Sequence, residues 1–397
     1  NRRGRRHDGA GPCVSTGAGS MKYPLEGVRV VELARILAGP WAGQTLADLG
    51  ATVIKVEAPE GDDTRRWGPP FIGTGDDKAA AYFHACNRGK KSITADFKSP
   101  EDLQRVKDLI GQADVVIENF KVGNLTKFGL DYETLKAANP RLIYCSITGF
   151  GQNGPYAHRA GYDFIIQGMA GLMHLTGEPD GQPQKVGVAF ADIFTGLYSV
   201  IAIQSALIMR EATGRGQHID MALFDSTVGV LANQAMNYLA SGVSPKRLGN
   251  AHPNIAPYQV FPVSDGYLII ACGNDSQFAK LTATLGVGEI AAEERFSTNP
   301  LRVHSRAALT EILEARTGSW KRDELLAALE KVGVPAGPIN TLEDVFSDPQ
   351  IVHRAMVVEN DGVKGVRSPI SFSEAELSVS QRSPHLGEHN GAGFERR

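Results

Sequence analysis

The sequence lacks the features that identify several large classes of protein. It contains no run close to the roughly 18 consecutive apolar residues that a membrane-spanning helix needs. Its 397 residues include only four cysteines, at scattered positions and without a Cys-x-x-Cys pair. This pattern indicates free thiols in a reducing compartment. We therefore predict a cytoplasmic protein that holds no metal and does not act at a membrane.

Strong net charge and the common nucleotide-binding motifs are also missing. The formal net charge of −3 does not provide the basic surface that nucleic-acid binding requires. No Walker A, HExxH, GxSxG or GxGxxG motif occurs. The turn after the first predicted strand offers only Gly39 and Gly43, too few glycines to cradle a pyrophosphate in the Rossmann manner. These absences disfavour a nucleic-acid binder and a nicotinamide-dependent enzyme.

The composition is that of a soluble globular protein, with 42% apolar and 21% charged residues. A chain of this length suits two domains or one large elaborated domain. We predict a disordered leader at residues 1–20, a large domain at 21–224, a small domain at 225–330 and a return segment to the large domain at 331–397. The leader is rich in Arg and Gly. If it is the remnant of an organelle-targeting peptide, the protein is mitochondrial instead.

Strand and helix patterns alternate through the first part of the chain. Residues 25–57 have the pattern of a buried strand, a helix and a second strand, which together form a βαβ unit. Residues 91–120 repeat this order, with Ser99 as the expected N-cap of the helix. The alternation predicts an α/β fold with a doubly wound parallel sheet and ligand sites at the carboxyl ends of its strands. Long apolar helices are expected at residues 192–214 and 219–241.

Asp192 lies in the segment GVAFADIFTG, at the start of the first of these apolar helices, and allows two interpretations. It is either an ordinary helix N-cap or a covalent nucleophile that the positive end of the helix keeps ionised. Of two other polar residues, only one remains open from its position alone. Asn119 ends a buried strand and is either a turn residue or a ligand contact, while Asp163 is expected only to begin a helix.

Taken together, several segments resemble class III CoA transferases, the CaiB/BaiF family, from about Leu25 to His389. No single motif is decisive, but the ordered set is specific. The matching segments are LEGVRVVELARILAGPWAGQTLADLGATVIKVE, GDDTRRWGPPF, NRGKKSITADFK, ADVVIENF, GLDYETLKAANPRLIYCSITGFGQNGP, RAGYDF, GVAFADIFTGLYS and ATGRGQHIDMALFD.

The resemblance implies an enzyme with Asp192 as its nucleophile and a CoA thioester as substrate, without a permanently bound cofactor. It also implies a Rossmann-like large domain that binds CoA, a smaller α+β domain and an interlocked homodimer. Carried over position by position, the residues expected at the CoA site are Ile36, Ala38, Ala58, Ala95, Lys98, Asn119, Phe120, Lys127, Arg159 and Tyr162. Ala58 departs from members with Arg at this place, so Arg65, Arg66, Lys98 or Lys127 would carry more of the phosphate charge.

Alternatives on the same fold are a 2-methylacyl-CoA racemase and a non-catalytic CoA-binding protein. Racemases need a histidine where this chain has Tyr162, and a phenol is a poor replacement near neutral pH. The segment GNAHPNIAPYQVF replaces the glycine loop of the oxalate branch. The segments GLMHLTGEPDGQP, AHPNIAPYQVF, GNDSQF and GVPAGPINTLEDVF most resemble the branch that acts on succinyl-CoA and glutarate. We therefore expect succinyl-CoA as donor and a dicarboxylate as acceptor. Its second charge needs a cation or N–H donors. Residues 247–258 either supply them or only cap a loop.

Overall fold

The computed structural model describes residues 22–395, so the predicted leader lies outside the described residues. The chain forms two compact units. The first consists of the described residues up to Leu33, of Gly43–Val116 and of the described residues from Val358 on. The second consists of Ala34–Ala42 and Ile117–Val357.

A six-stranded sheet has the order β5-β2-β1-β6-β7-β8. The pairs β1–β2, β2–β5 and β7–β8 are parallel, as the alternating strand and helix pattern predicts. The inner strands β2, β1, β6 and β7 are almost wholly buried, as expected where both faces of a parallel sheet are covered, whereas the edge strand β8 is largely exposed or half-buried. Their bounds are β1 Arg29–Glu32, β2 Thr52–Glu57, β5 Lys91–Thr94, β6 Val115–Glu118, β7 Ile143–Thr148 and β8 His218–Ala222.

Helices of the first part begin where the sequence predicts. Ser99 caps α3 by accepting the N–H of Asp102, and Pro100 occupies the first helical position. The elements that accompany the sheet here are α1 Ala38–Asp48, the short helix η1 Asp63–Arg66, β3 Phe71–Ile72, the short helix η2 Gly75–Asp77, β4 Ala79–Ala80, α2 Ala81–His84, α3 Pro100–Gly111, β12 Val357–Asn360 and β13 Val363–Val366.

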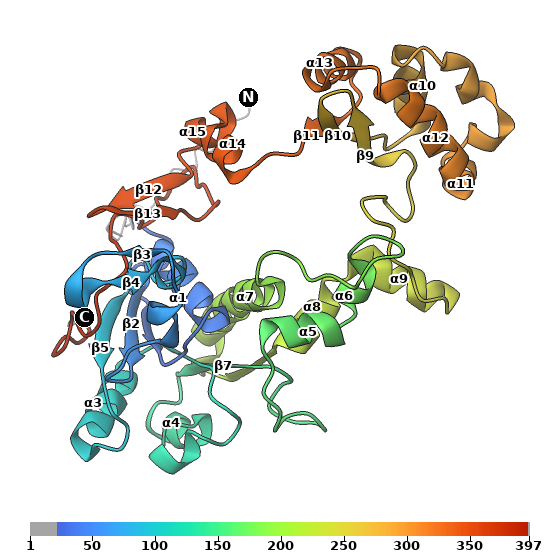
Figure 1. The fold of residues 1–397 in the computed structure, drawn as a ribbon. Coiled ribbons are helices and arrows are strands. Elements are labelled where there is room, and N and C mark those ends of the chain that lie inside the picture. Colours follow the sequence, from blue (N-terminus) through green and yellow to red (C-terminus); the bar gives the residue numbers. More distant parts are fainter. Residues whose placement is uncertain (1–21, 396–397) are drawn as a thin grey trace, which may run out of the picture. The chain divides into compact units, whose positions relative to one another are not determined.

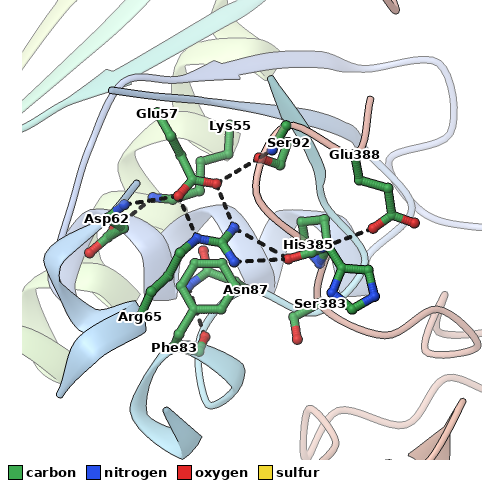
Figure 2. A network of polar contacts seen from close by, with 12 residues as sticks. Lys55, Glu57, Asp62, Arg65, Phe83, Asn87, Ser92, Ser383, His385 and Glu388 are labelled. Atoms are coloured by element: carbon green, nitrogen blue, oxygen red, sulfur yellow. Dashed lines mark hydrogen bonds and ion pairs between the residues drawn. The ribbon is translucent and has the colours of Figure 1, made fainter. Parts of the chain in front are cut away.

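Buried charges in the first unit form a network of ion pairs and hydrogen bonds, in which the N–H of Asp62 donates to Glu57 (Figure 2). Lys55 Nζ lies 3.1 Å from Glu32 Oε1 and 3.0 Å from Asp62 Oδ2. Arg65 forms a bidentate ion pair with Glu57, with Nε–Oε2 and Nη2–Oε1 distances of 2.8 and 2.7 Å. Its guanidinium lies 3.7 Å from the centre of the Phe83 ring. Pairing of this kind is what makes buried charge tolerable.

The C-terminal segment joins the same network. Arg65 donates to the carbonyl oxygen of Pro384, and the hydroxyl of Ser92 donates to Glu57 while it accepts the N–H of Gly387. The N–H of His389 then donates to the carbonyl oxygen of Ser92. The segment therefore covers the outer edge of β5 and satisfies backbone groups that an edge strand leaves open.

In the second unit, a long helix, α7, lies between strands β7 and β8 along the chain, at Phe190–Thr213, close to the predicted 192–214. The other helices before the small sheet are the short helix η3 Thr126–Phe128, α4 Tyr132–Ala138, α5 Asp163–Met169, α6 Leu172–Leu175, α8 Leu223–Gly229 and α9 Ala232–Ser241. The single apolar helix expected at 219–241 is wrong. This segment begins as strand β8, which pairs with β7, and the following helix breaks at Ala232, whose φ is +47°.

Helix α7 also corrects the expectation that no segment is long and apolar enough to cross a membrane. Its 24 residues meet that test by length and composition. The core helix of a soluble protein meets the same test, so one such helix is weak evidence for a membrane segment.

The last part of the second unit has its own core, built on the antiparallel sheet β11-β10-β9 (Figure 1). Fully buried Phe261, Phe278 and Phe296 contribute to this core, together with leucines from the helices. The elements are β9 Tyr258–Val263, β10 Gly266–Ala271, α10 Asp275–Thr284, the short helices η4 Gly288–Ala292 and η5 Glu294–Phe296, α11 Asn299–His304, α12 Arg306–Thr317, α13 Arg322–Val332 and β11 Ala336–Pro338. Two short helices follow, α14 Leu342–Ser347 and α15 Pro349–His353.

Candidate active site

A cavity of about 270 Å³ opens in the second unit at the carboxyl ends of β6 and β7. This is where ligands bind in doubly wound sheets. Asp192 lines the cavity. The lining also includes residues 35–38 ahead of α1, residues 119–122 after β6, residues 147–149 at the end of β7 and residues 159–162 ahead of α5.

Asp192 is the third residue of α7 and not its N-cap, so the N-cap interpretation is wrong. The N-cap position belongs to Ala189, which has no side chain able to accept a hydrogen bond. Asp163 takes this role from α5, because its Oδ1 accepts the N–H of Ala191 at 2.7 Å and that of Asp192 at 3.3 Å. The first turn of α7 is thus capped from outside, and the Asp192 carboxylate is left for the cavity.

The electrostatic surroundings of Asp192 differ from the sequence-based expectation. Burial, and then the negative charge of Asp163, raise the pKa of the Asp192 carboxyl to about 7. The positive end of α7 was expected to favour the ionised form, but two of its N–H groups donate to Asp163 instead. A carboxylate that is poorly solvated by its surroundings is a stronger nucleophile than one held by hydrogen bonds.

Gln167 fixes the segment that leads into α7, and sequence reasoning missed it. Its buried amide donates to Asp163 Oδ2 at 2.7 Å and accepts the N–H of Val186 at 2.9 Å. Asp163 and Gln167 are four residues apart on α5 and therefore share one face of that helix. This spacing within GYDFIIQG was the available signal, but an ordinary helix shows the same spacing.

Residues 35–38 form a tightly specified turn against the end of β6. The Asn119 side chain accepts the N–H of Arg35 at 2.9 Å and donates to the carbonyl oxygen of Arg35 at 2.6 Å. The next residue, Ile36, has a φ of +73°, which is rare for a β-branched residue and costs backbone energy. Asn119 is therefore more than a turn residue, because its amide holds a strained turn at the cavity.

Six of the residues predicted for the CoA site line this cavity: Ile36, Ala38, Asn119, Phe120, Arg159 and Tyr162. Lys127 belongs to the same unit, in the short helix η3, and is not among the lining residues. Ala58, Ala95 and Lys98 belong to the first unit, where Ala58 follows β2 and the other two follow β5.

Two of the four cations proposed to replace the missing arginine at position 58, Arg65 and Arg66, form ion pairs with other residues. Arg65 was expected to bind phosphates, but its guanidinium is held in the buried ion pair with Glu57. Arg66 forms an exposed pair with Asp63. Among residues 22–395, no group of three or more His, Cys, Asp or Glu side chains is arranged to hold a metal ion.

Residues 247–258, expected to bind the second carboxylate, do not line the cavity. The Arg247 guanidinium donates to the carbonyl oxygens of His174, Glu178 and Gly181 at 3.4, 3.2 and 3.0 Å. It thereby fastens the loop that precedes α7. Asn254 bonds to Asn233 and Asn237 on α9, so it too has a structural role.

The similarity to known proteins covers almost the whole chain. The model of CoA-transferase family III matches residues 25–390. The chain is 59% identical to "Succinate--glutarate CoA-transferase" of Agrobacterium fabrum over 376 residues, which cover 93% of the chain and 94% of that protein. It is 44% identical to "Succinyl-CoA:glutarate CoA-transferase" of Homo sapiens, covering 92% of the chain and 84% of that protein.

A solved structure described as a CAIB/BAIF family protein from Brucella suis is 71% identical to the chain. The two superpose with a TM-score of 0.85, over 94% of this chain and 98% of that one. The resemblance seen in the ordered sequence segments is thereby confirmed.

Proposed function

Because the chain belongs to CoA-transferase family III, we propose that it moves CoA from succinyl-CoA to glutarate through a covalent intermediate on Asp192. The observation that carries the mechanism is the position of Asp192, in a cavity at the ends of parallel strands and with its first helical turn capped by another residue. The names of the curated relatives support the two substrates.

In the first half of the reaction, an Asp192 oxygen attacks the thioester carbonyl of succinyl-CoA. The carbon–sulfur bond breaks, CoA leaves as a thiolate, and a mixed anhydride joins the succinyl group to Asp192. The thiolate then attacks the aspartyl carbonyl, so succinate is released and CoA is bound to Asp192 as a thioester.

The second half uses the same steps in reverse order. A carboxylate oxygen of glutarate attacks the aspartyl thioester and expels the thiolate, which forms an anhydride between glutarate and Asp192. The thiolate next attacks the glutaryl carbonyl. Glutaryl-CoA leaves, and the Asp192 carboxylate is restored. No oxidant, reductant or metal enters this balance.

The charge of the cavity suits these substrates. Its lining contains the cations Arg35, Lys121 and Arg159, whereas Asp192 is the one acidic residue among the described residues that line it. A cleft with an excess of positive charge raises the local concentration of anionic thioesters and carboxylates.

The direct test is to replace Asp192 with Asn and with Ala. Both variants should fold and lose CoA transfer, and hydroxylamine added during turnover of the wild type should modify the peptide that contains Asp192. Asp323→Asn is the matched control, because Asp323 also lies in the first turn of a helix of the second unit and is exposed. Turnover by folded Asp192→Ala protein would refute the covalent mechanism.

The proposal includes the homodimer that the family resemblance implies. Helix α7 carries an exposed apolar face, with Ile201, Ile208 and Met209 at 56, 75 and 55% exposure, and large exposed apolar faces are typical of interfaces. Sedimentation velocity should give a dimer that persists on dilution, because interlocked chains separate only by unfolding. A folded monomer at low concentration would contradict this part of the proposal.

A further inference from the structure

We propose that Arg35 determines which acyl groups the enzyme accepts. Its guanidinium binds the free carboxylate of a succinyl or glutaryl group, while the other end of that group reacts at Asp192. The inference rests on the proposed CoA transfer. It replaces the sequence-based expectation that residues 247–258 bind this carboxylate, because none of these residues lines the cavity.

The backbone that presents Arg35 is fixed from both sides. Asn119 bonds to the N–H and to the carbonyl oxygen of Arg35, and the strained Ile36 turns the chain directly afterwards. Strain of this kind persists only where the surroundings determine it, and such positions cluster at ligand sites. The backbone that carries the Arg35 side chain is therefore preorganised, and a preorganised donor loses less entropy when it binds a carboxylate.

The turn of residues 35–38 packs directly against the side of α7 that carries Asp192. A Cβ placed on Gly196 would lie 2.8 Å from the carbonyl oxygen of Ala38 and 3.2 Å from Cβ of Trp41. Gly196 is one helical turn beyond Asp192, so the two residues share a face of α7. A glycine there permits the close approach, which brings the Arg35 turn beside the nucleophile.

The chemistry requires a cation at this place. Donor and acceptor acyl groups are both attacked at, or by, Asp192, so the succinyl and glutaryl groups occupy the same subsite in turn. Each keeps one ionised carboxylate that does not react, and burying it without a partner is unfavourable. A guanidinium binds a carboxylate through two parallel hydrogen bonds, and its length and planarity accommodate chains of slightly different length.

The other two cations of the cavity are less suited to this task. The Arg159 guanidinium lies over the rings of Tyr156 and Phe150, at 4.6 and 5.3 Å from their centres. Lys121 lies in the loop after β6 and also borders a second cavity of about 220 Å³. Neither has a backbone locked in the way that Asn119 locks Arg35 beside the turn packed on α7.

The test compares glutarate with monomethyl glutarate, which has the same reacting carboxylate but no distal charge. With succinyl-CoA as donor, kcat/KM for the acceptor reports the second half-reaction alone. The wild type should prefer glutarate by about 100-fold, the effect expected when one charge-assisted carboxylate contact is lost. In Arg35→Gln, this preference should fall to about threefold or less, mainly through KM for glutarate. Arg35→Lys should recover part of it, because the charge remains while the paired hydrogen bonds do not.

Lys121→Gln is the matched control, since it removes a neighbouring cation of the same cavity. It should weaken the attraction of both acceptors to the cavity and leave most of the preference for glutarate intact. If Arg35→Gln keeps the full preference for glutarate, or if the wild type uses both acids equally, the assignment of Arg35 is overturned while the proposed function stands. A wild-type enzyme that forms no glutaryl-CoA from succinyl-CoA overturns both.

Discussion

Asp163 caps the helix that carries Asp192: the Oδ1 atom of Asp163 accepts the backbone N–H of Asp192 at 3.3 Å and that of Ala191 at 2.7 Å. The second carboxylate oxygen of Asp163 accepts from Gln167. Asp163 thus takes up N–H groups that would otherwise stabilise an ionised Asp192, and it adds a negative charge nearby. Two acidic residues at one helix end are given different roles by their hydrogen bonds.

Replacing Asp163 with Asn should shift the pH dependence of CoA transfer to lower pH. The nucleophile must be ionised, so kcat/KM of the wild type should rise with pH through about 7, the pKa of the half-buried Asp192. Asn removes the second cause of the raised pKa and keeps an oxygen that accepts from α7. The midpoint should therefore fall, although burial holds it above the ordinary value. A pH profile with an unchanged midpoint in a folded variant would contradict the coupling of the two carboxyl groups.

Replacing Asp192 with Asn should stabilise the protein at alkaline pH. The pKa of Asp192 is raised on folding from 3.8 to about 7, so its protonated form favours the native state. That contribution is present below about pH 3.8 and is lost as pH rises through about 7. At pH 8 the variant should gain roughly 2–4 kcal/mol over the wild type. Urea titrations at pH 8 and pH 4 check this, since the difference should nearly vanish at pH 4.

Replacing Arg247 with Ala should lower CoA transfer to glutarate and to monomethyl glutarate by similar factors. Its guanidinium bonds to three backbone carbonyls of the loop that precedes α7, so its loss should loosen that loop and not change the recognition of a distal charge. Steady-state kinetics with both acceptors measures the ratio. A selective loss for glutarate would restore the sequence-based hypothesis that residues 247–258 bind the second carboxylate.

Replacing Lys55 with Met should destabilise the protein by about 3–5 kcal/mol, because it leaves buried Glu32 and Asp62 without one of their partners. The control is Arg66→Met, which removes an ion pair exposed by 57 and 41% and should cost less than about 0.5 kcal/mol. Both values come from urea unfolding monitored by circular dichroism. Equal costs for the two variants would show that the buried network in Figure 2 contributes no more than a surface pair.

Long, regular patterns gave reliable predictions. The alternation of buried strands with amphipathic helices placed β1, β2, β5 and β6, and Ser99 caps α3 as expected. The same approach failed at residues 219–241, where apolar residues are shared between a strand that pairs with β7 and two short helices. Short apolar runs do not distinguish strand from helix, because strand pairing with a distant segment decides between them.

By itself, the sequence determined the alternating α/β order, the family and the candidacy of Asp192, because these depend on local periodicity and on the order of segments along the chain. Only the tertiary structure decided the environment of Asp192, since its helix cap comes from Asp163, 29 residues earlier. It also decided that Asn119 holds Arg35 at the cavity, across 84 residues of sequence. Hydrogen bonds between segments so far apart leave no periodic trace, because their geometry exists only after the sheet has brought the strand ends together.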